Sequence, residues 1–288
     1  MGIPAARSAI QTASPPARRL LGVFAGGAEA GEGASMTVFS APAAAGRYDA
    51  ARELPAETKA LWREALKSAV PGQVNRVLDL GCGTGRLTAV LAEAFACPVI
   101  GVEPSEAMLS VAMSQSLPQV EWKSGSAEDI PLEDQAVDLV FMSQVFHHLV
   151  RPAEALREIR RVLTLAGYLV IRTSSRENNA QNGWLRCFPE AQEIEQKRGH
   201  SQRELEVFVC DQSFALVSRQ TVLQRFASSP QEYYEKIGQR GLSSLIALSD
   251  DAFGEGLQRL QKWADSRPQD APVDEPVDLF VFQKTGST

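Results

Sequence analysis

The sequence predicts an α/β fold in which a mostly parallel, doubly wound sheet is covered by helices on both faces. Short apolar runs typical of buried strands alternate with amphipathic helical patterns between residues 77 and 175, and the connections between them are short. The first connection is the glycine-rich turn "GCGTG", which directly follows the run "VLDL". Strands that read as nearly continuous apolar runs are typical of parallel sheets buried on both sides.

The elements of this pattern follow in order along the chain. A helix is expected from Leu54 to Ala69, where apolar residues recur at three- and four-residue spacing before "PG" interrupts the pattern. Helices are also expected with an N-cap at Ser105 and with an end at Gly167. The expected strands are "RVLDL", "PVIGVEPS", "VEWKSGS", "AVDLVFMSQ" and "YLVIRTS", and the helices between them are "RLTAVLAEAF", "SEAMLSVAMSQ" and "PAEALREIRRVLTLAG".

Beyond Ser175 two long helical segments interrupt the alternation, at about residues 176–212 and 228–274. They flank an expected sixth strand, "FALVSRQTVLQRFAS", and the second, with the helices "SPQEYYEKIGQRGLSSL" and "SDDAFGEGLQRLQKWADS", precedes a last strand, "EPVDLFVFQK". Connections of this length are uncommon unless they carry a function, so we expect them to form a lid or substrate wall. The sequence therefore predicts a single domain over residues 47–288 with two insertions.

Residues 1–46 differ in composition from the rest of the chain. They are rich in Ala, Gly, Pro and Ser and contain no acidic residue before Glu29. We expect a flexible, disordered leader without a function of its own; a targeting peptide and a misplaced start, with Met36 as the natural one, are the alternatives.

The net charge limits the kinds of molecule that the chain is expected to bind. A formal net charge of −6 argues against a nucleic acid as the main partner, because nucleic-acid-binding proteins usually present a basic face. No apolar run is long enough for a membrane span. The four cysteines lack metal-ligand spacing, so free thiols, no metal site and a cytoplasmic location are expected. We expect a small-molecule substrate and a monomer or homodimer.

The glycine turn indicates which ligand the sheet binds. Ligands bind beyond the carboxyl ends of parallel strands, and glycines allow a ligand to approach the backbone closely. The spacing here is Gly81-x-Gly83-x-Gly85, whereas a dinucleotide-binding turn reads G-x-G-x-x-G and has a glycine where this chain has Arg86. Asp79, just before the turn, would repel a phosphate but can receive a cation or, through water, an ammonium group. The turn therefore disfavours a nicotinamide dinucleotide.

Four motifs in order resemble the class I S-adenosylmethionine-dependent methyltransferases. They are "VLDLGCGTGRLT", "VIGVEPSEAML", "GSAEDIPLEDQAVDLVFMSQVFHHL" and "ALREIRRVLTLAGYLVIRT", and the resemblance extends from about Tyr48 to Thr173. It is closest to the small-molecule, "type 11"-like group. It implies a seven-stranded sheet whose last strand, "VDLFVFQK", is reversed, with S-adenosyl-L-methionine as cofactor and S-adenosyl-L-homocysteine as product.

The resemblance also implies roles for individual residues. Asp79 would hold the amino group of the cofactor through water, and Glu103 would accept both ribose hydroxyls. Ser126 stands where many relatives have Asp, so the backbone of Ala127 is expected to replace that contact to the adenine. The other implied contacts are Gly81, Cys82 and Gly83 to the methionine part, Pro104 and Met108 to the adenine face, Glu128 to its edge, Ser143 and Gln144 to the sulfonium, and Tyr48 and Arg52 from a closing helix.

Candidates for catalysis are few. His147 and His148 follow the fourth strand, and an imidazole can remove a proton from a hydroxyl or amine near neutral pH. We expect His148 on the cofactor side and His147 on the substrate side, while packing or capping of the next helix is the structural alternative for each. Arg176 to Asn179 follow the fifth strand at the ligand edge and are candidates for substrate contact. Tyr233 and Tyr234 are expected on a half-buried helix face.

The acceptor is expected to be small and partly apolar, with an oxygen, nitrogen or carbon nucleophile. Apolar residues of the inserted segments can wall a closed pocket or simply pack the added helices, and both readings are open for Trp184, Leu185, Phe188, Phe208, Leu242, Leu245, Ile246, Leu248 and Phe253. A tRNA or protein methyltransferase and a non-catalytic S-adenosylmethionine-binding protein are the alternative functions.

Overall fold

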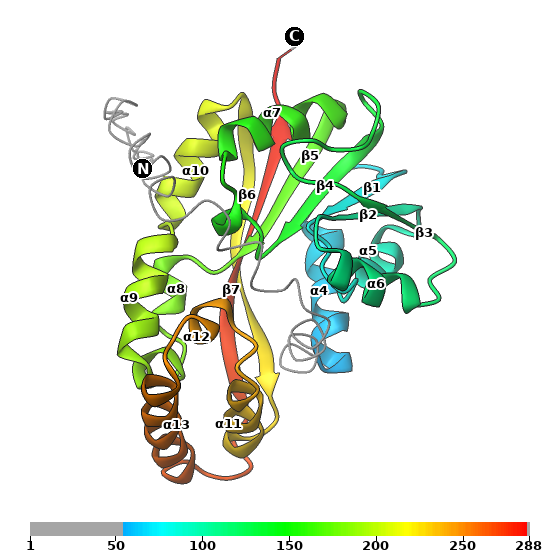
Figure 1. Ribbon diagram of the computed structural model, residues 1–288. Coiled ribbons are helices and arrows are strands. Elements are labelled where there is room, and N and C mark those ends of the chain that lie inside the picture. The colour runs from blue at the N-terminus through cyan, green and yellow to red at the C-terminus, as the bar shows by residue number, and fades with distance from the viewer. Residues whose placement is uncertain (1–53, 287–288) are drawn as a thin grey trace, which may run out of the picture.

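The computed structural model describes residues 54–286, and their central element is one seven-stranded sheet (Figure 1). The strand order is β3-β2-β1-β4-β5-β7-β6. Neighbours among β1 to β5 are parallel, whereas β7 runs antiparallel to both β5 and β6. The predicted fold class, including the reversed last strand, is therefore confirmed. The strands are β1 (Val77–Leu80), β2 (Val99–Glu103), β3 (Val120–Ser124), β4 (Val137–Ser143), β5 (Leu163–Thr173), β6 (Phe214–Ala227) and β7 (Val273–Lys284).

Helices cover both faces of the sheet because successive strand residues point to opposite sides. Val77 packs in one core with α4 (Ala56–Ala69) and α5 (Thr88–Phe95), while Leu78 packs in the other with α7 (Pro152–Val162) and α10 (Gln202–Asp211). All four residues of β1 are buried. The remaining helices are α6 (Glu106–Ser114), α8 (Arg176–Asn179), α9 (Pro189–Arg198), α11 (Pro230–Gly238), α12 (Ser243–Ile246), α13 (Asp250–Asp265) and the 3₁₀ turns η3 (Phe146–His148) and η4 (Leu185–Cys187).

Side-chain caps fix several helix starts. The Ser105 hydroxyl accepts the Met108 N–H at 3.4 Å, as the sequence predicts, and Ser249 caps α13 in the same way. At the start of α10, Ser201 and Glu204 form a reciprocal capping box. The cap at Ser105 places the N-terminus of α6 next to the end of β2, which precedes it.

Two predicted boundaries were wrong. The helix α7 ends at Val162, and β5 begins at Leu163, so Gly167 lies inside a strand. A Cβ at position 167 would lie 2.9 Å from Leu163 Cδ2 and 3.1 Å from the Thr164 carbonyl oxygen, so this glycine serves close packing rather than helix termination. The helix expected over residues 229–245 is split into α11 and α12 by a bend in which Arg240 adopts a φ of 53°.

The long strands β6 and β7 extend past the rest of the sheet. The last β5–β7 pair is Thr173 with Asp278, whereas β6 and β7 remain paired as far as Ala227 and Val273. In Figure 1 this extension runs down between α11, α12 and α13. We call the cap the set of elements that share a third hydrophobic core with it: η4, α9, α11, α12 and α13. Of the first inserted segment only the part before α10 belongs to the cap, because α10 packs on the sheet.

One buried carboxylate joins β7 to the segments through which the chain leaves and re-enters the sheet. Asp278 is fully buried, and it accepts the Ser175 N–H at 3.0 Å and the Asn178 side-chain amide at 2.7 Å. It also accepts Gln202 Nε2 at 2.8 Å and the Thr221 hydroxyl at 3.1 Å. These four donors come from the end of β5, from α8, from α10 and from β6. Asp278 thus fixes the directions in which the chain leaves and re-enters the sheet.

We expect Asp278→Asn to destabilise the fold. An amide has one acceptor oxygen instead of two and turns its own N–H groups toward donors, so the loss is expected to be about 2–4 kcal/mol of unfolding free energy. Urea denaturation measures it. Asp270→Asn, at an exposed position, is the control and should change stability by less than about 0.5 kcal/mol. Equal stability of the two variants would contradict the role given to Asp278.

Candidate functional site

A cavity of about 460 Å³ lies at the carboxyl ends of the parallel strands, between the sheet and the cap. This is the edge at which open α/β sheets bind ligands, and the strand order reverses there between β1 and β4. Its sheet half includes Gly81, Gly83, Glu103, Pro104, Met108, Ser126, Ala127, Glu128, Ser143, Gln144, His147 and His148. Its cap half includes Asn179, Asn182, Trp184, Glu195, Arg198, Phe226, Leu242, Ser243, Ser244 and Glu275.

The glycine turn after β1 forms the floor of the sheet half. Gly81 and Gly83 have φ values of +71° and +58°, in the left-handed region that favours glycine. A Cβ at Gly81 would lie 2.5 Å from Val145 Cγ2, whereas space is open around Gly83. The turn therefore exposes backbone to the cavity at Gly83 and could not be built with larger residues.

Glu103 ends β2 beside this turn. One carboxylate oxygen accepts the Gly83 N–H at 3.0 Å and the other accepts the Ser105 N–H at 3.0 Å. Burial raises the pKa of Glu103 above its usual range, although these two hydrogen bonds oppose the shift. Each carboxylate oxygen has a second lone pair, so a 1,2-diol can bind both oxygens. This arrangement fits the ribose of S-adenosylmethionine, which is the cofactor of the family that the motifs resemble.

Asp79 and Cys82 lie behind the cavity rather than in its wall. Asp79 is buried in β1, where it accepts the Thr88 hydroxyl at 2.6 Å, and desolvation raises its pKa to about 7. Burial also raises the pKa of the Cys82 thiol, so the thiol stays protonated and unreactive. The expected contact of Asp79 through water stays a prediction, and Cys82 serves as a small side chain within the turn.

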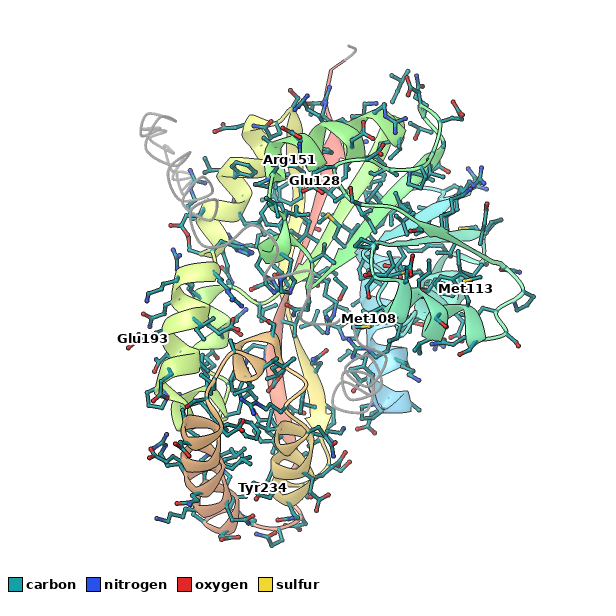
Figure 2. All side chains as sticks on the ribbon, viewed as in Figure 1. Met108, Met113, Glu128, Arg151, Glu193 and Tyr234 are labelled. Atoms are coloured by element: carbon teal, nitrogen blue, oxygen red, sulfur yellow. The ribbon has the colours of Figure 1, made fainter. Side chains whose placement is uncertain are left out.

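The segment expected to border the adenine is held in place from α7. The carboxylate of Glu128 accepts the Arg151 N–H at 3.3 Å, and Figure 2 shows the two residues next to each other. Met108, buried in the first turn of α6, lies toward the centre of the molecule, whereas Met113 lies at its outer side (Figure 2). The resemblance assigned Pro104 and Met108 to the adenine face and Ser126, Ala127 and Glu128 to its edge, and all five line the cavity.

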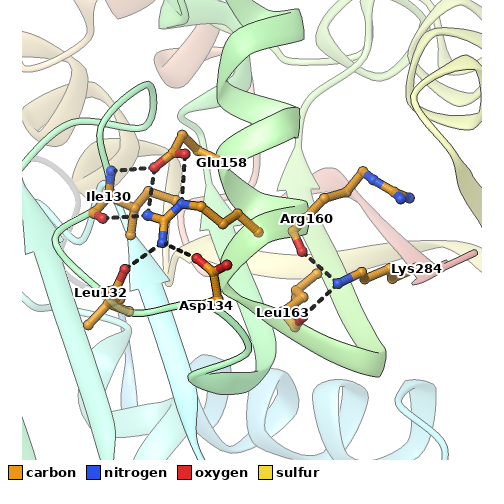
Figure 3. A network of polar contacts seen from close by, with 8 residues as sticks. Ile130, Leu132, Asp134, Glu158, Arg160, Leu163 and Lys284 are labelled. Atoms are coloured by element: carbon orange, nitrogen blue, oxygen red, sulfur yellow. Dashed lines mark hydrogen bonds and ion pairs between the residues drawn. The ribbon is translucent and has the colours of Figure 1, made fainter. Parts of the chain in front are cut away.

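A second network anchors the loop that follows this segment (Figure 3). Arg161 donates to the carbonyl oxygens of Ile130 and Leu132 at 2.9 and 2.7 Å and pairs with Glu158 and Asp134. Glu158 in turn accepts the Ile130 N–H at 3.1 Å. Because α7 packs on the sheet, this network fixes the loop relative to the strand ends.

The end of β4 carries an unusual backbone conformation. Gln144 has a φ of 58° and donates its N–H to the Arg172 carbonyl at 2.8 Å. Strain of this kind in a cavity wall is typical of functional sites. The rings of His147 and His148 follow on η3 with centroids 4.0 Å apart. Ser143 lies at the same strand end, where its hydroxyl accepts from Arg172 at 2.9 Å.

Not all predicted residues belong to this site. Tyr48 and Arg52 lie outside the described residues. Among the residues offered as a pocket wall, Trp184 and Leu242 line the cavity, whereas Phe208 packs in the sheet core. Leu185, Phe188, Leu245, Leu248 and Phe253 pack in the cap, and Ile246 is half-buried and belongs to neither group. Tyr233 is fully buried, contrary to its predicted half-buried face, while Tyr234 is half-buried.

The sequence interpretation missed most of the cap half. Asn179 was a candidate, but Asn182, Glu195, Ser244 and Glu275 were not. They come from four separate parts of the chain and have no motif spacing. Asn182, Ser244 and Glu275 are marked only by their burial as polar residues, and Glu195 is half-buried. Within residues 54–286 no helix is both long and apolar enough to cross a membrane, and no cluster of His, Cys, Asp or Glu has the arrangement of a metal site.

Comparison with known proteins supports this geometry. Residues 78–171 match the model of a family described as a methyltransferase domain. An uncharacterized methyltransferase of Mycobacterium tuberculosis is 42% identical over 123 residues, which are 43% of this chain and 49% of that protein. The ubiquinone/menaquinone biosynthesis C-methyltransferase of Rubrivivax gelatinosus is 37% identical over 153 residues, 52% of this chain and 58% of that protein. The chain thus spans about half the length of these curated relatives.

Solved structures share the fold. The YcgJ protein of Bacillus subtilis superposes with a TM-score of 0.54 at 18% identity and covers 80% of this chain and 99% of that one. The [4+2]-cyclase SpnF superposes with a TM-score of 0.53 at 20% identity, over 77% of this chain and 79% of that one. The name of the second protein describes a reaction other than methyl transfer, so similarity of fold alone does not determine the chemistry.

The raised pKa of Asp79 makes stability depend on pH with a definite sign. Between its ordinary value of 3.8 and about 7, the folded protein holds a proton that the unfolded chain has released, so stability falls as pH rises through this window. We expect the unfolding free energy of the wild type relative to Asp79→Asn to decrease by up to about 4 kcal/mol between pH 4 and pH 7. Urea denaturation across this range measures the difference.

A control follows from the Thr88 hydrogen bond. This bond stabilises the carboxylate, so Thr88→Val should raise the pKa of Asp79 further and move the decrease to higher pH. A wild-type-minus-variant difference that is flat, or that rises with pH, would contradict the assignment.

Proposed function

Because residues 78–171 form a class I, S-adenosylmethionine-dependent methyltransferase domain, we propose that this chain transfers a methyl group from S-adenosylmethionine to a small, partly apolar acceptor. The observation that carries the proposal is the position of Glu103. Its carboxylate joins the glycine turn to the end of β2, at the wall of a cavity that continues into the cap.

The sheet half of the cavity is proposed to hold the cofactor. Glu103 would accept the two ribose hydroxyls, the backbone at Gly83 would contact the methionine part, and Met108 would pack on the adenine. Ala127 and Glu128 would border the adenine edge. This proposal is supported by the fact that these residues, which the motifs single out independently, line one continuous wall.

The chain's contribution to the reaction is mainly alignment. S-adenosylmethionine, when bound, supplies a methyl group activated by the sulfonium, so a lone pair of the acceptor can form the new bond to carbon while the electrons of the broken C–S bond stay on sulfur. The protein must then hold the acceptor in line and exclude water. The apolar side chains of Trp184, Phe226 and Leu242 in the cap half are suited to both tasks.

If the nucleophile carries a proton, a base has to take it. His147 and His148 are the candidates because both line the cavity at the end of β4, next to Gln144. We propose His147 for this role and His148 for cofactor contact. The proton would leave the acceptor oxygen or nitrogen for an imidazole nitrogen of His147.

The alternatives are less well supported. A tRNA methyltransferase needs a basic docking surface, which the net charge of −6 disfavours. A non-catalytic cofactor-binding protein would have its acceptor space blocked by side chains, yet here the cavity extends past Gln144 and His147 to Trp184 and Glu275. A small-molecule acceptor is also consistent with the C-methyltransferase among the relatives.

Calorimetric titration with S-adenosylmethionine and S-adenosylhomocysteine tests the cofactor assignment. We expect Glu103→Ala to weaken both by roughly 30-fold or more, because two hydrogen bonds to a charged group are lost. Glu133→Ala, at an exposed loop position, should bind as the wild type does. An unchanged affinity of Glu103→Ala, or tighter binding of a nicotinamide dinucleotide, would refute the proposal.

Steady-state kinetics separate the two histidines. With an acceptor found among small phenols or amines, His147→Gln should lower the methyl-transfer rate about 100-fold and remove its rise with pH. His148→Gln should instead raise the KM for S-adenosylmethionine with little change in the pH profile. Identical pH profiles for the wild type and both variants would show that neither histidine is the base.

A further inference from the structure

Two buried polar atoms in the cap half of the cavity lack the hydrogen bonds that buried groups normally make. They are the side-chain oxygen of Asn182, which is 5% exposed, and the hydroxyl of Ser244, which is 1% exposed. Neither atom is hydrogen-bonded to any of the residues that the structure describes. Most buried polar groups are satisfied, so two unsatisfied ones in the wall of one cavity require an explanation.

The orientation of Asn182 follows from a short relay. The carboxylate of Glu195 can only accept, so Asn179 must turn its NH₂ group toward it, at 2.9 Å. The oxygen of Asn179 then faces Asn182, whose NH₂ group donates to it at 3.3 Å. The amide donor of Asn182 is thereby engaged, and its oxygen remains as an acceptor. Flipping the amide would break this chain.

Apolar side chains line the cavity around these atoms. The same wall also contains a carboxylate, which provides further hydrogen-bond acceptors. Trp184, Phe226 and Leu242 line the same half of the cavity. Glu275, also in this wall, accepts the Tyr233 hydroxyl at 2.8 Å, and that hydroxyl accepts the Trp184 N–H at 3.2 Å. Because the Trp184 N–H in this contact is that of the backbone, Tyr233 positions the Glu275 carboxylate and the main chain at Trp184.

We infer that the cap half recognises a neutral or cationic acceptor that presents an N–H or O–H group on an apolar frame. Asn182 offers it an acceptor oxygen, and Ser244 offers a hydroxyl that can accept or donate. An anionic acceptor is disfavoured because two carboxylates, Glu195 and Glu275, lie in the same wall, while Arg198 is exposed to solvent. This inference rests on the proposed function, since it concerns the acceptor side of that site.

A set of compounds with one frame tests the inference: 5-aminoindane, 5-hydroxyindane, 5-methylindane and indane-5-carboxylate. Their binding to the full chain saturated with S-adenosylhomocysteine is measured by ligand-observed NMR titration. We expect the amine or the phenol to bind roughly three- to tenfold more tightly than the methyl compound, and the carboxylate to bind most weakly.

Two variants connect this preference to the residues. Ser244→Ala and Asn182→Leu should each remove most of the preference for the donor-bearing compounds. Ser244→Ala should also keep or raise the thermal midpoint of unfolding, because it deletes a buried hydroxyl without a partner. Removal of a hydroxyl that makes a structural hydrogen bond would instead lower the midpoint. Gln181→Leu makes the same amide-to-leucine change at the exposed neighbouring position and should leave the preference intact.

The outcomes distinguish this inference from the proposed function. Equal binding of the four compounds, binding of none, or a preference for the carboxylate overturns it. A preference for the donor-bearing compounds that persists in both variants also overturns the inference, because a trapped water rather than the ligand then satisfies the oxygens of Asn182 and Ser244. In each case S-adenosylhomocysteine still binds the same samples. Failure of S-adenosylhomocysteine itself to bind the wild type would instead overturn the proposed function, and the inference with it.

Discussion

The path of the chain at the edge of the sheet, where the inserted segment after β5 begins and returns, depends on the buried carboxylate of Asp278. It lies at the residue where β7 loses β5 as a partner and continues with β6 alone. Its four donors come from the end of β5, from two helices of the first inserted segment and from β6. A reversed strand between β5 and β6 is what makes this possible, because it brings the last part of the chain to the same edge as the ends of the parallel strands. The cavity exists because the two halves meet at a fixed distance there.

A second buried group connects the other face of the sheet to the site. The guanidinium of Arg172 is 2% exposed, lies over the Trp62 ring at 4.4 Å and donates to Gln224 at 2.6 Å. Gln224 also accepts the Trp62 indole N–H at 2.8 Å. The helix α4 is therefore fixed to β5 and β6 through one amide oxygen. Because the same guanidinium donates to Ser143, a disturbance of this packing would reach the end of β4, where the strained Gln144 follows.

The sequence predicted the fold and the sheet half of the site because both depend on local patterns. The glycine turn, the acid that ends β2 and the cap at Ser105 are each readable within a few residues. The errors arose where tertiary contacts decide. Gly167 resembled a helix end until its packing against Leu163 was known, and Phe208 resembled a pocket wall although α10 lies on the sheet. Asn182 and Ser244 could not be predicted, because what marks them is burial without a partner, and burial is a property of the folded chain.

The two halves of the cavity come from different parts of the chain, and this bears on which acceptor the protein can use. The family match covers residues 78–171, which hold β2 to β4, most of β1 and β5, and the sheet half of the cavity. The cap and its polar wall lie entirely outside that match. A shared fold is compatible with a different reaction, as the cyclase of similar structure indicates by its name. The task proposed for the sheet half, to hold a cofactor over the strand ends, is therefore separate from the choice of acceptor. That choice depends on side chains that the inserted segments bring to the same edge, and Asp278 fixes the point at which the first of these segments leaves the sheet.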